Sequence, residues 1–149
     1  MNQITLGLTG KGKLNNRREL DFYPTPKDVT IALMEFLNLE KTNIWEPACG
    51  NGAMVKVLES YGHNVTGTDI TEGYDYLKIN GTGLANVIIT NPPFSLSDQF
   101  IEKALKEADI VCMLLKSQYW HAKKRRRLFI NNLPSYILPL TWRPDFFRT

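Results

Sequence analysis

Two short segments carry the residues best suited to chemistry, and each follows a stretch that is typical of a β-strand. The first, residues 46–52 (EPACGNG), is a turn whose glycines lack a Cβ and so let backbone N–H groups approach a ligand closely. Asp69 ends the next strand-like stretch, 17 residues beyond Gly52, where a carboxylate can accept hydrogen bonds from both hydroxyls of a ribose. Together they predict a nucleoside-containing cofactor, and the plainer alternative is a glycine-rich loop beside a solvent-facing carboxylate.

This turn differs from the one that binds the pyrophosphate of dinucleotides. The fingerprint G-x-G-x-x-G needs a third glycine for close packing of the helix, and Val55 occupies that position here. Glu46 and Pro47 precede the turn, which also departs from the fingerprint. The sequence therefore disfavours NAD and is compatible with a cofactor that carries no phosphates.

The second segment is residues 91–94 (NPPF), directly after the apolar residues 87–89. Pro92 and Pro93 have no N–H donor and a fixed φ, so the loop is stiff and its carbonyls have few local partners. The Asn91 carboxamide and a neighbouring carbonyl offer two acceptors, and Phe94 offers a face for a planar ring. These groups fit an amino-substituted heterocycle, whereas the alternative is a proline turn that closes a buried strand with Phe94 in the core.

In their order along the chain, these elements resemble the S-adenosylmethionine-dependent N6-adenine methyltransferases. An aromatic-Thr-Pro element at residues 22–26 (FYPTP) comes first, and EPACGNG, Asp69, Asp75 and NPPF follow. The resemblance covers about residues 22–147 and is greatest to the short DNA adenine methyltransferases of phages and prophages. NPPF after an apolar strand is its most specific element.

The resemblance implies transfer of a methyl group from S-adenosylmethionine to the exocyclic N6 of adenine in DNA. The residues that it implies for the cofactor are Phe22, Tyr23, Thr25 and Pro26 at the methionine end, Glu46, Ala48, Gly50 and Gly52 in the loop, Asp69 at the ribose, Ile70 against the adenine ring and Asp75 at its amino group. For Asp75, an ordinary surface carboxylate is the alternative.

The residues expected to be catalytic are Asn91, Pro92, Pro93 and Phe94. The lone pair of N6 is delocalised into the purine, so hydrogen bonds to the Asn91 side-chain oxygen and the Pro92 carbonyl would favour a more tetrahedral, nucleophilic nitrogen. Because the amine is paired in a duplex, the enzyme must flip the base or act on an unpaired strand, and Phe94 would stack on the extruded adenine. The reaction needs no metal, and the sequence offers no His/Cys cluster for one.

The charge distribution predicts a polyanionic partner. The net charge is +3, but residues 1–109 carry 10 basic and 14 acidic side chains, whereas residues 110–149 carry 8 basic and 1 acidic. Such polarity favours nucleic acid, DNA or RNA, over a solvated helix face. The residues expected to bind it are Lys116, Tyr119, Trp120, Lys123, Lys124, Arg125, Arg126, Arg127 and Arg143.

Alternating periods predict the elements that position these segments. Strands are expected at residues 43–45, 64–68, 74–79, 86–90, 110–115 and 136–140. Helices are expected from Pro26 with Thr25 as its cap, over residues 54–61, around residues 100–108 and, strongly basic, over residues 119–131. The pattern indicates an α/β fold with a mostly parallel sheet and helices on both faces. The resemblance implies that this is a Rossmann-like class I methyltransferase fold.

Length and composition indicate one domain over residues 21–149, preceded by a flexible arm at residues 1–20, and the resemblance implies that this is a methyltransferase domain. A chain of 149 residues with 43% hydrophobic and 22% charged residues is typical of a globular domain and excludes collagen-like and disulfide-stapled classes. The apolar runs are too short to cross a bilayer and nothing reads as a secretory signal, so we expect no membrane partner. A cytoplasmic protein of a bacterial or phage-infected cell, with Cys49 and Cys112 reduced, is expected.

Several alternatives stay open. An adenine in RNA or a glutamine amide in a protein suits an Asn-Pro-Pro loop equally well, and a non-catalytic nucleic-acid-binding protein could retain the fold. The resemblance implies a seventh, antiparallel strand after residues 143–147, yet the sequence stops at Thr149. We therefore expect that strand to be missing, and the alternatives are a truncated chain, a minimal enzyme and an enzyme whose sheet a partner completes. The oligomeric state and the recognised DNA sequence are left open.

Overall fold

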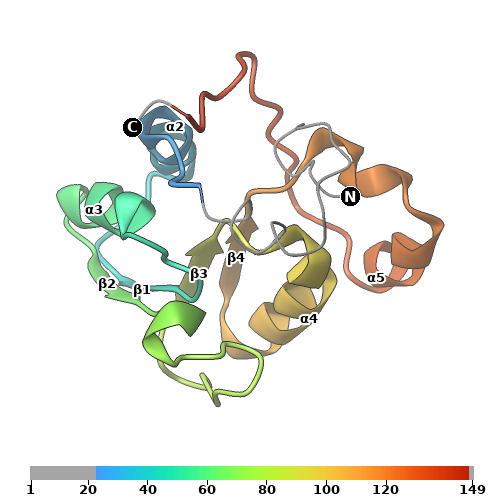
Figure 1. Cartoon of the computed structure of the whole chain (residues 1–149), viewed down its shortest axis with the longest axis horizontal. Coiled ribbons are helices and arrows are strands. Elements are labelled where there is room, and N and C mark those ends of the chain that lie inside the picture. Colours follow the sequence, from blue (N-terminus) through green and yellow to red (C-terminus); the bar gives the residue numbers. More distant parts are fainter. Residues whose placement is uncertain (1–22, 148–149) are drawn as a thin grey trace.

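The computed structural model describes residues 23–147, which form an α/β fold around a parallel sheet. Its four strands are β1 (Asn43–Glu46), β2 (Asn64–Gly67), β3 (Val87–Thr90) and β4 (Ile110–Met113). They lie in the order β2-β1-β3-β4, and every neighbouring pair is parallel (Figure 1). The predicted strands at residues 43–45, 64–68, 86–90 and 110–115 are confirmed, whereas the expected arm at residues 1–20 lies outside the described residues.

Helices cover both faces of this sheet, as predicted. Side chains on a strand alternate between its two faces. Ile44, Val87 and Ile89 pack with Met34 of α2 (Lys27–Leu37) and with residues of α3 (Ala53–Ser60). On the opposite face, core packing with α4 (Ser97–Glu107) involves Trp45, Ile88, Tyr76, Phe100 and Ala104. Two apolar layers therefore hold the strands rigidly from either side.

The predicted strand at residues 74–79 is wrong, because this segment is a series of turns. The N–H groups of Lys78 and Ile79 donate to the Asp75 carbonyl within the segment, and side chains of α4 hold its end. Lys103 Nζ donates to the Ile79 carbonyl at 2.6 Å, and the Gly81 N–H donates to Glu107 Oε1 at 2.9 Å. A Cβ at Gly81 would lie 2.1 Å from the Trp45 ring, so only glycine allows this close approach.

The expected basic helix over residues 119–131 is largely wrong as well. Two short 3-10 segments, η4 (Ser117–His121) and η5 (Lys123–Arg125), precede a single short helix, α5 (Arg126–Asn131). Five consecutive cations at residues 123–127 repel one another, and no carboxylate lies within residues 110–144 to pair with them along a helix. The chain instead follows contacts to α4, described below.

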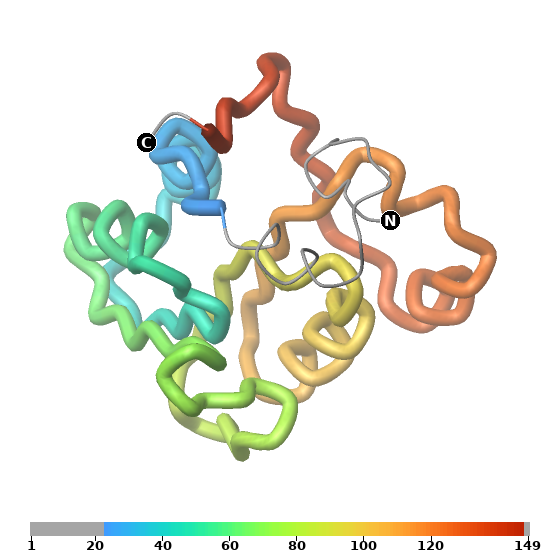
Figure 2. The backbone as a smooth tube through the Cα atoms, in the orientation of Figure 1, coloured from blue at the N-terminus to red at the C-terminus, as the bar shows by residue number. Residues whose placement is uncertain are grey.

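The expected strand at residues 136–140 does not form either. In the part of the chain that the structure describes, β4 is therefore one edge of the sheet, and β2 is the other. Pro139 lies inside this stretch and has no N–H for a ladder. The C-terminal segment returns to α2, as the tube in Figure 2 shows. Tyr136 packs edge-on against Phe36 at 5.2 Å between ring centroids, and Trp142 Nε1 donates to Asp28 Oδ2 at 2.6 Å.

Candidate functional site

The candidate site lies at the carboxyl ends of β1, β2 and β3. From β1 the chain crosses to β2 on one side, and it later enters β3 on the other side of β1. This reversal between β1 and β3 is a topological switch point, where ligands of open parallel sheets characteristically bind. The two segments singled out by sequence, residues 46–52 and 91–94, follow β1 and β3 there, and Asp69 follows β2.

The glycine-rich turn begins α3 in a conformation that needs glycine. Gly50 has a φ of 52° and Gly52 a φ of 80°, both in the left-handed region. The Gly52 N–H donates to the Cys49 carbonyl at 2.8 Å, and its own carbonyl accepts from the Lys56 N–H. The Cys49 N–H donates to the Thr68 carbonyl at 3.0 Å, which ties the turn to the end of β2.

Asp69 holds this turn from the neighbouring strand. Its buried carboxylate accepts from the Gly50 N–H at 2.9 Å through Oδ2, and from the Thr71 N–H and hydroxyl through Oδ1. A carboxylate has about four acceptor positions, and these three bonds leave one on Oδ2. The turn and the acid paired by sequence reasoning are thus in direct contact.

The two other residues predicted beyond β2 lie in different settings. Ile70 directly follows Asp69 and leaves 62% of its surface exposed. Asp75 lies in the turn that replaces the predicted strand. There its Oδ1 accepts from the Leu77 N–H at 3.1 Å and its Oδ2 pairs with Lys78 at 3.2 Å. These local bonds match the surface-carboxylate alternative more closely than they match an adenine contact.

Glu46 is a carboxyl group enclosed at the end of β1, with only 2% of the residue exposed. Its Oε1 accepts from the Ala48 N–H at 3.1 Å. Burial and, less strongly, the nearby Asp69 charge raise the pKa of Glu46 to about 8, although the bond from the Ala48 N–H offsets part of the increase. Near neutral pH this carboxyl group is therefore mostly protonated.

Asn91 is joined to the aromatic-Thr-Pro element. Its Nδ2 donates to Thr25 Oγ1 at 3.2 Å, across 66 residues of sequence. The prediction that Thr25 caps α2 is wrong, because Pro26 is the N-cap residue and no side chain caps this helix; the hydroxyl accepts from Asn91 instead. Tyr23 and Pro26 lie beside Thr25 in the chain and are half-buried, and Phe22 lies outside the described residues.

Two acceptors of the NPPF loop are left for an external donor. The Pro93 carbonyl accepts from the Leu96 N–H at 2.9 Å, and the Phe94 carbonyl accepts from Ser97 Oγ at 2.9 Å. Within residues 23–147, no hydrogen bond uses Asn91 Oδ1 or the Pro92 carbonyl. These are the two atoms that the sequence analysis assigned to an incoming amine.

Phe94 is half-buried at the start of η3 (Phe94–Leu96), and a cation lies over it. Lys116 Nζ, from the loop after β4, is 5.2 Å from the centroid of the Phe94 ring. A cation at this distance is attracted by the face of the ring. Of the basic residues predicted to bind nucleic acid, Lys116 is thus the one that directly adjoins the NPPF loop.

Two of the predicted nucleic-acid contacts have structural roles. Tyr119 is buried, and its hydroxyl bonds to Ser97 and Asp98 at the start of α4. Arg125 Nε donates to Asp98 Oδ1 at 2.9 Å, and its guanidinium lies 3.9 Å from the Tyr119 ring centroid. Burial, with the hydrogen bond to Asp98, raises the pKa of Tyr119 to about 12. This cluster anchors the basic segment to α4, buries Tyr119 and leaves only 15% of the Arg125 side chain exposed.

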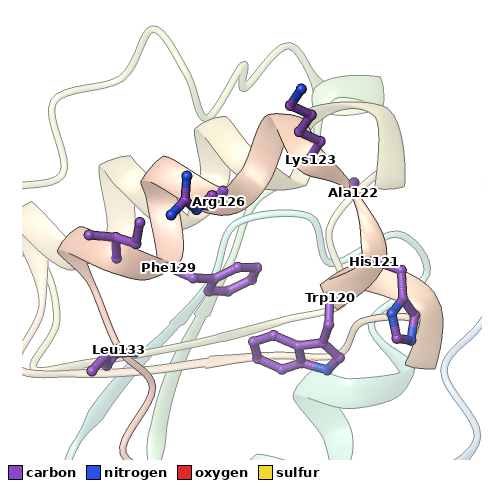
Figure 3. Close-up of a pocket in the computed structure, with 8 residues that line it drawn as sticks. Trp120, His121, Ala122, Lys123, Arg126, Phe129 and Leu133 are labelled. Carbon is purple, nitrogen blue, oxygen red and sulfur yellow. The ribbon is translucent and has the colours of Figure 1, made fainter.

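The remaining predicted contacts are exposed, and beside them lies a hollow that sequence reasoning missed. Exposed residues are Trp120, Lys123, Lys124, Arg126, Arg127 and Arg143. Trp120 and the first turn of α5 line a hollow of about 580 Å³ together with Phe129, Ile130 and Leu133 (Figure 3). The sequence signal that could have indicated this hollow is the apolar stretch LFI at residues 128–130, directly after the basic run.

Within residues 23–147, no cluster of His, Cys, Asp or Glu could hold a metal ion, and no helix has the length and apolar character needed to span a bilayer. No protein family, curated protein or solved structure matches this chain.

Proposed function

We propose that this protein is an S-adenosylmethionine-dependent methyltransferase acting on the N6 amine of adenine in DNA, with a Rossmann-like class I fold. The observation that carries the proposal is a pair of acceptors at the switch point of the sheet, Asn91 Oδ1 and the Pro92 carbonyl, which no donor among residues 23–147 uses. An exocyclic NH₂ group has two hydrogens to donate, one for each of two acceptors on a stiff loop.

The bond between Asn91 Nδ2 and Thr25 fixes how the carboxamide is presented. Because the nitrogen donates to Thr25 Oγ1, the oxygen of the same amide is directed to another donor. Both acceptors interact more strongly with the amine as positive charge develops on N6, so they stabilise the transition state more than the bound substrate. Phe94 supplies the face on which the adenine stacks.

The residues around the glycine-rich turn fit the proposed cofactor. The N–H groups of Cys49, Gly50 and Gly52 donate within the protein, so the turn contributes its close-approaching glycine backbone. A ribose acceptor at Asp69 and an exposed apolar side chain at Ile70 suit a nucleoside without phosphates. The buried Glu46 carboxyl suits the ammonium group of a methionine, since a cation nearby favours its ionised form. When bound, this cofactor supplies an electrophilic methyl group on a sulfonium.

The basic segment supports a nucleic acid as the substrate. Lys116 lies over Phe94, and the exposed cations Lys123, Lys124, Arg126 and Arg127 carry positive charge in the same segment. Contacts of this kind hold phosphates and confer affinity without reading a sequence. DNA is proposed as the substrate because of the resemblance of the motifs. RNA is the competing substrate, and the experiment below tests both.

The test is transfer of tritium from labelled S-adenosylmethionine to DNA, to RNA of the same sequence and to protein. We expect N6-methyladenine in DNA, and a decrease in kcat on the order of 100-fold to 1,000-fold for Asn91→Ala, the usual loss for a group that stabilises transition-state charge. Asn64→Ala, an exposed asparagine at the opposite edge of the sheet, is the matched control and should keep wild-type activity. Cofactor binding without methyladenine in any DNA, or an unaltered rate for Asn91→Ala, would overturn the proposal.

A further inference from the structure

The hollow beside α5 combines apolar walls with a cationic rim. Trp120 and Phe129 form one side, with ring centroids 4.5 Å apart and planes inclined by 38°. Ile130 and Leu133 continue the apolar lining, and His121, Lys123 and Arg126 complete the rim. Figure 3 shows the Phe129 ring pointing toward the Trp120 indole, with Lys123 and Arg126 along the adjoining turn.

This lining keeps large apolar side chains at the surface. Trp120 is 37% exposed, Ile130 62% and Leu133 81%. Exposed aromatic and aliphatic groups gathered in one concavity mark a binding surface more often than scattered ones do. The lining therefore calls for an occupant that is flat or apolar.

The hollow is fixed in place relative to the NPPF loop. Phe129 packs edge-on against the buried Tyr119, at 5.8 Å between centroids. The Ser97 hydroxyl has two acceptors within hydrogen-bond distance, the Tyr119 hydroxyl oxygen at 3.2 Å and the Phe94 carbonyl at 2.9 Å, and shares its one proton between them. One serine thus links the wall of the hollow to the loop proposed to hold the target adenine.

Charge selects among the possible occupants. No Asp or Glu lies between Ile110 and Pro144, and five cations occupy residues 123–127. An apolar peptide or a second copy of the chain would gain little from this rim, whereas a nucleic acid brings phosphates to the cations and rings to the aromatic wall. In a duplex the bases are stacked inside, so only an unpaired base can enter the hollow.

We propose that this hollow binds an unpaired nucleobase of the nucleic-acid strand that carries the target adenine, while that adenine lies at the NPPF loop. The preferred substrate is then a single strand or an opened duplex. The inference rests on the proposed function, because it identifies the form of the nucleic acid that this function uses. Stacking on Trp120 and Phe129 would hold the base, while Lys123 and Arg126 would contact its flanking phosphates.

The experiment measures binding of fluorescent DNA to the full chain, as a single strand, as a duplex and as a single strand with abasic sites. Trp120→Ala should weaken binding of the single strand roughly 5-fold to 100-fold, the range for loss of one stacked base, and should hardly change duplex binding. Abasic strands should bind the wild type as weakly as intact strands bind this variant. The matched control is Trp142→Ala, since Trp142 is 39% exposed but bonded to Asp28 outside the hollow.

Leu133→Asp is a second variant, chosen because a residue this exposed can change without loss of folding. It should also lower affinity for the single strand, because it places an anion among the phosphates. Equal losses for single strand and duplex, unchanged binding by both variants, or a change of oligomeric state in Trp120→Ala would each overturn the inference.

The same measurements separate this inference from the proposed function. If the wild type methylates DNA and Trp120→Ala keeps its KM for a single strand, the inference alone fails. If strands bind through Trp120 but no DNA is ever methylated, the proposed function fails and the base-binding hollow stands. Circular dichroism of each variant confirms that it is folded.

Discussion

Two regions of this molecule hold the side chains proposed to be functional by different means. At the carboxyl ends of β1, β2 and β3, the hydrogen bonds between parallel strands fix the backbone positions of Glu46, Asp69 and Asn91. In the basic segment, residues 116–147, no strand forms among the described residues, and contacts such as Tyr119 with Asp98 hold the chain. A ladder fixes position through the backbone itself, whereas such anchors depend on particular side chains.

The largest effect is expected in the first region, from the buried Glu46. Its pKa is about 8 in the folded protein against 4.5 for the free group, so the folded state retains a proton that the unfolded chain has lost. The free energy of unfolding should then fall as pH rises from about 4.5 to 8, by up to about 1.4 kcal/mol per pH unit. Glu46→Gln should remove this slope and be the more stable form at pH 8.

Urea unfolding at pH 5, 6, 7 and 8 checks this expectation. Glu59→Gln is the control, since Glu59 is an exposed carboxylate on α3 and should leave the slope of the wild type intact. A wild-type free energy of unfolding that stays level, or rises, over this range would mean that Glu46 is already ionised in the folded state.

A smaller effect in the same region concerns how Asp69 holds the glycine-rich turn. Asp69→Ala removes the acceptor for the Gly50 N–H and for both donors of Thr71. The substitution also removes the proposed ribose acceptor, and since a hydrogen bond to a charged group contributes about 1.5–3 kcal/mol, we expect affinity for S-adenosylmethionine to drop on the order of 100-fold. Calorimetric titration measures it, with the exposed Asp109→Ala at the opposite edge of the sheet as control.

The sequence predicted this region well because its signals are local. The apolar residues 87–89 followed by two prolines predict where β3 ends, and the glycines of residues 46–52 predict the turn. The contact between Asn91 and Thr25 could not be predicted, because 66 residues separate the partners and no local pattern encodes it.

The second region was predicted poorly for the same physical reason. Tyr119 and Trp120 are adjacent aromatic residues, yet one is buried beneath Arg125 and the other lines the hollow. What separates them is Asp98, 21 residues away on α4. The turns at residues 74–79 were misassigned likewise, because their partners Lys103 and Glu107 are supplied by α4.

Breaking the Asp98 anchor should therefore affect only the second region. Asp98→Ala removes the acceptor of both Tyr119 and Arg125, and we expect the free energy of unfolding to decrease by about 1–3 kcal/mol. Proteolysis should become faster around residues 120–131, while affinity for the cofactor stays at the wild-type value. A matched loss of cofactor affinity would mean that the two regions are coupled more tightly than their contacts indicate.

The smallest effect compares two neighbouring cations that the sequence does not distinguish. Lys124 is exposed, whereas Arg125 is paired with Asp98 and packed on Tyr119. If Lys124 contacts a phosphate, Lys124→Gln should lower the slope of log affinity against log salt concentration by about 1 for DNA, because one counterion fewer is released. Arg125→Gln should leave that slope unchanged and instead destabilise the fold.

DNA titrations from low to moderate salt, paired with urea unfolding of both variants, measure the salt slope and the free energy of unfolding. A slope that changed for Arg125→Gln and not for Lys124→Gln would contradict this prediction. It would mean that Arg125 contacts the phosphates and that Lys124 does not, so the assignment of Arg125 to the anchor and of Lys124 to the binding surface would be wrong.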